Sequence, residues 1–114
     1  MSLLKDINAV LDILGIPFET GVFTENAPDK YIVIEPLGDI FAVHADNQPL
    51  ADVEEARISL FAKGSYTSEK NAIVRAFLGA DFTITDRRYI GYETETGYYH
   101  YVVDIAKSYE WEET

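Results

Sequence analysis

The sequence contains no cysteine in its 114 residues, and only one methionine and one tryptophan. Without cysteine, the chain has no disulfide framework, no thiolate zinc site and no cysteine nucleophile. It also lacks any apolar run close to the roughly 20 residues that a membrane-spanning helix requires. We therefore expect neither sulfur-based chemistry nor an association with a membrane.

Positive charge is also scarce. Nine lysines and arginines stand against 20 aspartates and glutamates, which gives a formal net charge of −11. Proteins grip nucleic-acid backbones with basic side chains that displace counterions, so this balance opposes tight binding of DNA or RNA. A surface of like charge instead lets a polyanion pass without sticking. Such a chain also suits a small acidic protein that binds or inhibits a basic partner, as a mimic of nucleic-acid charge.

The sequence does contain enough apolar material for a core, with 47% hydrophobic and 13% aromatic residues. This composition excludes a disordered chain, and the length suits one domain, residues 1–114. No internal repeat, low-complexity tract or linker divides it. We expect a single globular domain.

The amino-terminal segment predicts an amphipathic helix. Apolar residues recur every three or four positions over residues 3–14, Ser2 is placed as the N-cap, and Gly15 with Pro17 ends the pattern. Its charged residues and the lack of a small-residue cleavage pattern distinguish it from a signal peptide, so we expect cytoplasmic synthesis. A second helix is predicted to follow the hydroxyl-rich turn at 63–68, which supplies its cap, and to end at Gly79.

Strand patterns surround these helices. We expect strands at 16–23, at 31–35 closed by Pro36, at 53–62 with Ser59 on the exposed face, and on either side of the turn at 93–97. Residues 38–49 combine weak pairing signals with turn residues and predict a mobile loop or a short hairpin. The predicted fold is α+β, with a mixed or mainly antiparallel sheet, two helices on one face and a long C-terminal β-hairpin.

No pattern in the sequence predicts catalysis. His44 and His100 are the only histidines, and neither has carboxylates at a metal-binding spacing. The serines lie outside any Gly-x-Ser-x-Gly setting, and the glycines are too scattered to cradle a phosphate. We expect a protein that is not an enzyme and that uses no metal or cofactor.

The C-terminal hairpin is the predicted site of interaction. Its tyrosines suit either ordinary cross-strand packing or an interface, since interfaces select Tyr, Trp and Arg. Arg87 and Arg88, expected at a bulge between two halves of a long strand, either lie over the sheet and pair with Glu93 and Glu95, or form the basic side of a contact between unlike surfaces. The candidate interface residues are Arg87, Arg88, Tyr92, Glu93, Glu95, Tyr98, Tyr99 and His100.

Four segments of the chain resemble one protein family. These are 27–34 (APDKYIVI), 55–61 (EARISLF), 80–90 (ADFTITDRRYI) and 97–101 (GYYHY). In this order they are similar to the tail terminator, or tail-completion and head-tail joining, proteins of long-tailed phages and prophages of Gram-positive bacteria.

The resemblance implies an α+β subunit that forms a homo-oligomeric ring, commonly a hexamer, at the head-proximal end of the tail tube. Its expected partners are further copies of itself, the major tail tube protein and a head-completion or connector protein, with DNA passing through the ring unbound. The expected location is the head-tail junction of the virion, after assembly in the bacterial cytoplasm. Neighbouring connector proteins are also small, acidic and ring-forming. The resemblance therefore does not distinguish between a terminator, a completion protein and a connector.

Overall fold

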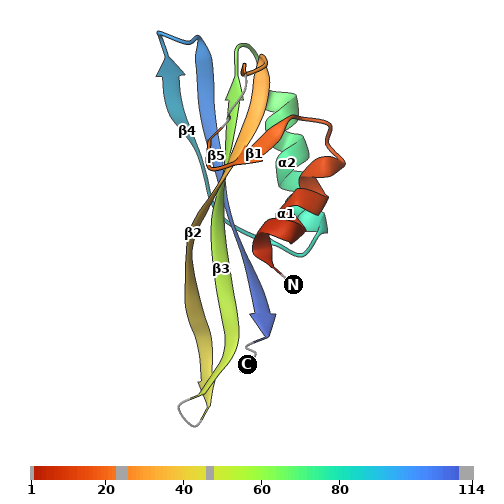
Figure 1. Ribbon diagram of the computed structural model, residues 1–114, viewed down its shortest axis with the longest axis vertical. Helices are drawn as coiled ribbons and strands as arrows, with labels where there is room; N and C mark the ends of the chain where they lie inside the picture. The colour runs from red at the N-terminus through yellow and green to blue at the C-terminus, as the bar shows by residue number, and fades with distance from the viewer. Residues whose placement is uncertain (1, 23–25, 46–47, 111–114) are drawn as a thin grey trace.

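The computed structural model describes residues 2–22, 26–45 and 48–110, which form two helices and a five-stranded mixed sheet (Figure 1). The strand order is β1-β2-β3-β5-β4; β1 runs parallel to β2, and the other neighbours are antiparallel. The predicted α+β fold is therefore confirmed. The elements are α1 (Leu3–Asp12), β1 (Phe18–Thr20), β2 (Lys30–Ala45), β3 (Gln48–Ala62), α2 (Thr67–Gly79), β4 (Thr83–Glu93) and β5 (Tyr98–Glu110).

Both helices lie on the same face of the sheet, as predicted (Figure 1). The sheet extends well beyond them, so the molecule is elongated and measures 53 × 25 × 23 Å. The β4–β5 turn lies at one end of the long axis, and the end of β2 with the start of β3 lies at the other. The helix-covered core occupies the region between them.

The first helix begins as the sequence indicates. The Ser2 hydroxyl accepts a hydrogen bond from the Lys5 backbone N–H at 3.2 Å, which satisfies one of the free donors of the first turn. Gly15 follows the helix with φ +74°, a left-handed conformation that glycine adopts without a steric penalty. The residues that this helix buries are Leu3, Ile7, Val10 and Leu11.

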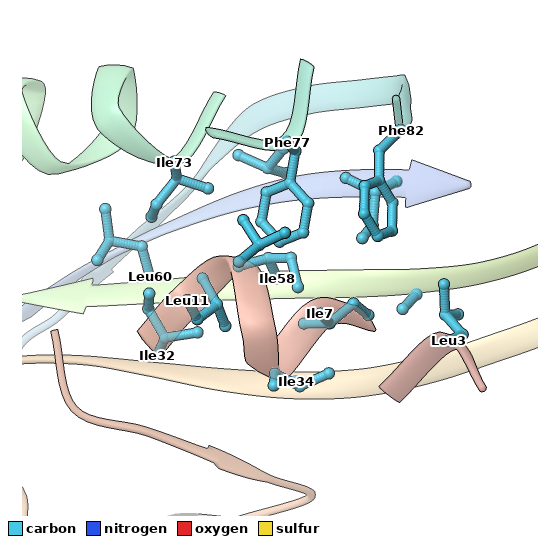
Figure 2. Packing of buried hydrophobic residues seen from close by; sticks show 14 residues of the cluster. Leu3, Ile7, Leu11, Ile32, Ile34, Ile58, Leu60, Ile73, Phe77 and Phe82 are labelled. Carbon is cyan, nitrogen blue, oxygen red and sulfur yellow. The ribbon is translucent and has the colours of Figure 1, made fainter. Parts of the chain in front are cut away.

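One hydrophobic cluster joins the helices to the sheet (Figure 2). Ile73 and Phe77 of α2 are fully buried, and Phe77 packs edge to face against Phe82 with 5.0 Å between ring centroids. The sheet contributes alternate residues of its central strands, because successive strand side chains point to opposite faces. Those residues are Ile32, Ile34, Ala56, Ile58, Leu60, Val103 and Ile105.

The largest difference from the sequence prediction concerns residues 38–49. Of these, 38–45 and 48–49 form the far part of a long hairpin and not a loop or a short one, while 46–47 lie outside the described residues. Strand β2 continues through Pro36 to Ala45, and β3 already begins at Gln48. Since β1 pairs only with 32–34, Pro36 lies on an unpaired edge where its missing N–H removes no ladder bond. Register shifts after Pro36 and around Val43 accommodate the remaining turn-forming residues.

Smaller differences appear elsewhere. The first strand spans only Phe18–Thr20 and Gly21 follows it with φ +86°; position 23 of the predicted strand lies outside the described residues. The second helix ends at Gly79 as predicted, but its N-cap residue Tyr66 makes no side-chain cap hydrogen bond, so the expected hydroxyl cap is wrong. The predicted C-terminal hairpin is confirmed, and the Gly97 N–H closes its turn on the Glu93 carbonyl at 2.7 Å.

Truncation of a core residue should show how much stability the single cluster supplies. Ile58 is fully buried in mid-strand, and we expect Ile58→Ala to lower the free energy of unfolding by about 2–5 kcal/mol. Urea unfolding followed by circular dichroism measures this loss. The matched control is Ile40→Ala on an outer strand, where the side chain is 58% exposed and the expected change is within about 0.5 kcal/mol. Equal losses in the two variants would contradict this assignment of the core.

Candidate interaction surfaces

The strand register divides the predicted interface residues between the two faces of the sheet. Arg87, Tyr92 and Tyr99 lie on the helix-covered face, because their partners in the ladder align with the core positions of β3 and β5. Arg88, Glu93, Tyr98 and His100 lie on the opposite face, here called the open face. Glu95 belongs to the turn between the strands. The eight residues therefore do not form one surface.

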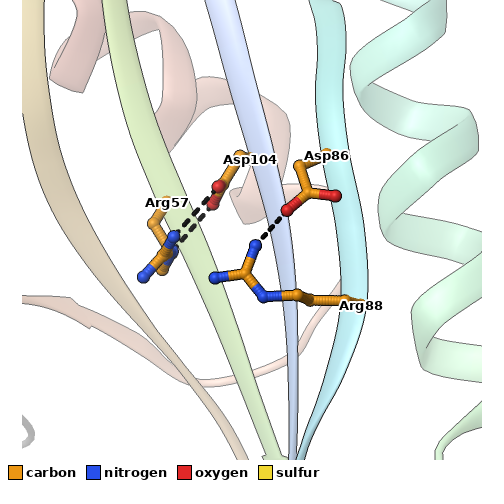
Figure 3. A network of polar contacts seen from close by, with 4 residues as sticks. All are labelled: Arg57, Asp86, Arg88 and Asp104. Carbon is orange, nitrogen blue, oxygen red and sulfur yellow. Dashed lines mark hydrogen bonds and ion pairs between the residues drawn. The ribbon is translucent and has the colours of Figure 1, made fainter.

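An ionic network crosses the open face (Figure 3). The Arg57 Nε and Nη2 donate to the two carboxylate oxygens of Asp104 at 2.8 and 3.1 Å, in a bidentate pair between β3 and β5. These hydrogen bonds to Asp104 raise the pKa of Arg57 above its ordinary value. Arg88 pairs with Asp86, two residues earlier on the same strand face. The contact is local because side chains at i and i+2 of a strand are neighbours. Pairing of Arg88 with Glu93 or Glu95, one of the two alternatives that the sequence left open, is not observed among the described residues.

Beside the network, the open face carries an aromatic stack. The Phe61 ring lies between Tyr31 and His100, with centroid distances of 4.8 and 4.2 Å. Tyr98 packs edge-on against Tyr31 and Phe61, is 6% exposed, and donates its hydroxyl proton to the Pro28 carbonyl at 2.7 Å. Tyr98 therefore contributes to the fold, and its side chain is not accessible to a partner.

Two polar atoms on this face lack partners among the described residues: the Ser59 Oγ and the His100 Nε2. Ser59 was predicted on the exposed face but is 1% exposed, because Val33 and Val102 flank it across the ladder and the ring of Phe61 follows two residues on. Burial lowers the pKa of His100, against the opposing charges of Glu93 and Glu35. His100 is thus held neutral within the aromatic stack.

Tyrosines gather on the helix-covered face at the β4–β5 end of the sheet. We call this group the tyrosine surface: Tyr66, Tyr89, Tyr92, Tyr99 and Tyr101. The Tyr66 ring lies parallel to Tyr89 at 6.5 Å, and Tyr92 contacts Tyr99 at 4.7 Å. Helix α2 does not extend over these rings, so Tyr89 and Tyr92 are each 49% exposed.

Basic side chains border the tyrosine surface. The Lys70 Nζ lies 5.3 Å from the centre of the Tyr101 ring, within the range of a cation–π contact. Arg87 is exposed on the same face of β4, two residues before Tyr89. Lys63 lines a cavity of about 350 Å³ beside Tyr66 and Tyr99, but its Nζ lies over the Tyr98 ring of the open face, 5.1 Å from the ring centre. No sequence pattern predicted a role for Tyr66, Lys63 or Lys70, because 63–68 indicate only a helix cap and turn and the residues that follow indicate only a packed helix.

The opposite end of the sheet is acidic and apolar. We call residues 35–45 of β2 and 48–55 of β3 the hairpin arm. No lysine or arginine occurs between Glu35 and Ala56 in the sequence. Large apolar side chains are nevertheless exposed there: Leu37 at 46%, Ile40 at 58% and Phe41 at 44%. Exposed apolar side chains on an extended hairpin are typical of a surface that a partner covers.

Carboxylates crowd one face of this arm. Asp39 stands directly opposite Glu54 in the ladder, and Phe41 opposite Asp52. Burial, reinforced by Asp39 and Asp52, raises the pKa of the Glu54 carboxyl, although the Leu3 backbone N–H opposes the shift. Lys107 neighbours Glu54 on β5, but its Nζ reaches Asp6 at 3.8 Å instead. Like charges opposite one another destabilise a strand pair, so the arm carries an electrostatic penalty in the single subunit.

Among the described residues, no group of three or more histidines, aspartates and glutamates is placed to hold a metal ion. A second cavity, of about 430 Å³, is apolar and lies between the helices, lined by residues such as Val10, Ile13 and Ala76. No helix in the described part of the chain is long and apolar enough to cross a membrane.

Comparison with known proteins found no family model and no curated protein that matches this chain. The similarity to tail terminator proteins therefore depends on the four sequence segments alone.

The neutral state of His100 predicts a pH-dependent stability. Its pKa is lowered in the folded protein from an ordinary 6.5, so the unfolded chain takes up a proton first as the pH falls. Stability from this group is present above pH 6.5 and is lost below it. When the pH is lowered from about 7.5 to about 5.5, we expect the free energy of unfolding of His100→Phe to rise relative to that of the wild type. Urea unfolding at several pH values measures the difference, and a difference that does not change with pH would contradict it.

The raised pKa of Glu54 predicts the opposite sign. Because its carboxyl holds its proton more tightly in the folded state, ionisation at neutral pH works against folding. We expect Glu54→Gln, which keeps an acceptor for the Leu3 N–H, to raise the melting temperature at about pH 7. The gain should shrink as the pH falls through the raised pKa. Glu95→Gln, in the exposed β4–β5 turn, serves as the control and should leave the melting temperature unchanged.

Proposed function

We propose that this protein is a structural subunit of a phage or prophage tail, a tail terminator or tail-completion protein that forms a ring at the head-proximal end of the tail tube. The observation that carries the proposal is the pair of exposed apolar surfaces at the two ends of the sheet. The tyrosine surface is bordered by Lys70 and Arg87, and the hairpin arm carries Asp39, Asp52 and Glu54.

A ring of identical subunits needs two different surfaces that fit each other, because each subunit contacts one neighbour on either side. The strong negative charge of the chain suits a ring through which DNA passes. These features and the resemblance of four segments support the same function.

The acidic arm also favours a second candidate, a binding protein or inhibitor that places its carboxylates against a basic partner. The two candidates differ in their oligomeric state. An inhibitor of this kind acts as a monomer or a dimer, whereas the tail protein assembles into a closed oligomer of several subunits.

Light scattering over a range of protein concentrations tests the proposed function, first with the protein alone and then with the major tail tube protein added. We expect a closed oligomer in at least one of these conditions, with a mass that is a fixed multiple of the 12.9 kDa subunit. It should co-sediment with assembled tubes and be seen at their ends by electron microscopy. A monomer that does not bind the tube protein would contradict the tail function and favour the inhibitor.

A further inference from the structure

We infer that the tyrosine surface of one subunit binds the acidic hairpin arm of a second copy of the chain. This inference rests on the proposed function and specifies the contact that builds the ring.

Charge complementarity favours this pairing. Four bases already pair with carboxylates of their own chain: Lys30 with Glu69, Arg57 with Asp104, Arg88 with Asp86, and Lys107 with Asp6. Lys70 and Arg87 have no ion pair with any described residue, and both lie at the tyrosine surface. Lys63 has none either, but its Nζ lies over the Tyr98 ring of the open face, 5.1 Å from the ring centre. The other two bases without a described ion pair, Lys5 on α1 and Arg75 on α2, make no described contact with these rings. Two positive charges that no carboxylate of the same chain neutralises therefore lie beside the exposed tyrosines.

The arm offers the matching arrangement. Asp39 and Phe41 are two residues apart in β2 and so share a face, opposite Glu54 and Asp52 of β3. An exposed aromatic ring thus lies among three carboxylates. The tyrosine surface has the reverse order, exposed rings bordered by ammonium and guanidinium groups. Aromatic and arginine side chains at the centre of a contact are typical of interfaces that bind strongly.

The positions of the two surfaces require a second molecule. The tyrosine surface lies near the β4–β5 turn, and the hairpin arm lies where β2 ends and β3 begins, at opposite ends of the 53 Å long axis (Figure 1). One chain therefore cannot join its own two surfaces. Because the surfaces differ, the contact is heterologous: repeated around a rotation axis it closes into a ring.

Two variants that each lose one surface test the contact. Asp39→Lys with Phe41→Ser alters the arm, and the new lysine faces Glu54, which favours folding. Arg87→Glu with Tyr89→Ser alters the tyrosine surface at exposed positions. Each variant alone should be monomeric at concentrations at which the wild type assembles. An equimolar mixture should form a dimer of twice 12.9 kDa, because one intact surface of each kind remains.

The matched control changes charge and apolar area on the helices. Arg75→Glu with Ile13→Ser alters two exposed residues away from both surfaces, one of them beside the apolar cavity between α1 and α2. It should assemble like the wild type. If it stays monomeric instead, the helical side is the interface and the inference is wrong.

Cross-linking provides a second measurement that does not require the surfaces to be destroyed. The chain has no native cysteine, so Tyr92→Cys subunits mixed with Asp52→Cys subunits can be joined by a bismaleimide only at the introduced positions. Position 52 stands opposite Phe41 on the proposed contact face, and this change keeps Phe41, Asp39 and Glu54. We expect a strong heterodimer band from this pair and a weak one from Ile13→Cys mixed with Asp52→Cys. Equal bands would overturn the contact.

The outcomes separate the inference from the proposed function. If the wild type assembles but both altered variants still assemble alone, or their mixture stays monomeric, the ring uses other surfaces and only the inference fails. If the wild type stays monomeric with and without the tail tube protein, the proposed function and the inference fail together.

Discussion

The structure depends on a mismatch in length between its sheet and its helices. Strand β2 has 16 residues and is about 50 Å long, whereas α1 with 10 residues and α2 with 13 are only about 15 and 20 Å long. Two helices of this size cover the middle of such a sheet and leave both ends bare. The core therefore forms in the middle. The exposed large apolar side chains of the strands lie toward the ends, while Ile13 and Leu78 are exposed on the helical side.

The open face is stabilised without a covering layer. The bidentate pair of Arg57 with Asp104 ties the two central strands together, and the stack of Tyr31, Phe61 and His100 covers the ladder beside it. Long side chains thereby shield the small ones, so that Val102 has no exposed area. The hairpin arm lacks this arrangement. It combines like charges that oppose one another with exposed Leu37 and Ile40, which is unfavourable in a single subunit and consistent with a surface meant for a partner.

The sequence predicted the elements whose signals are local. The cap at Ser2, the glycines after the helices and the turn that ends at Gly97 place both helices and the C-terminal hairpin near their observed bounds. It failed for the hairpin arm, because Pro36 and Gly38 are strand breakers only where the ladder needs their N–H or their side chain. On an outer edge with register shifts, the strand continues past them. That β1 is too short to pair with this part of β2 is not visible in any local pattern.

The candidate surface was predictable only in part for a similar reason. Composition and order along the chain determined the excess of acid, the lack of cysteine chemistry, the two helices and the tyrosine-rich hairpin. Only the tertiary structure decided which tyrosines meet. Tyr89 and Tyr92 are three residues apart and would face opposite sides of a regular strand, but the irregularity at Ile90 brings both to the face of Tyr101 and Tyr99. Tyr66 joins them from the start of α2, and Tyr98 turns away into the open face. Side-chain direction in a sheet changes with every single-residue shift in register, and pairing between distant strands sets that register.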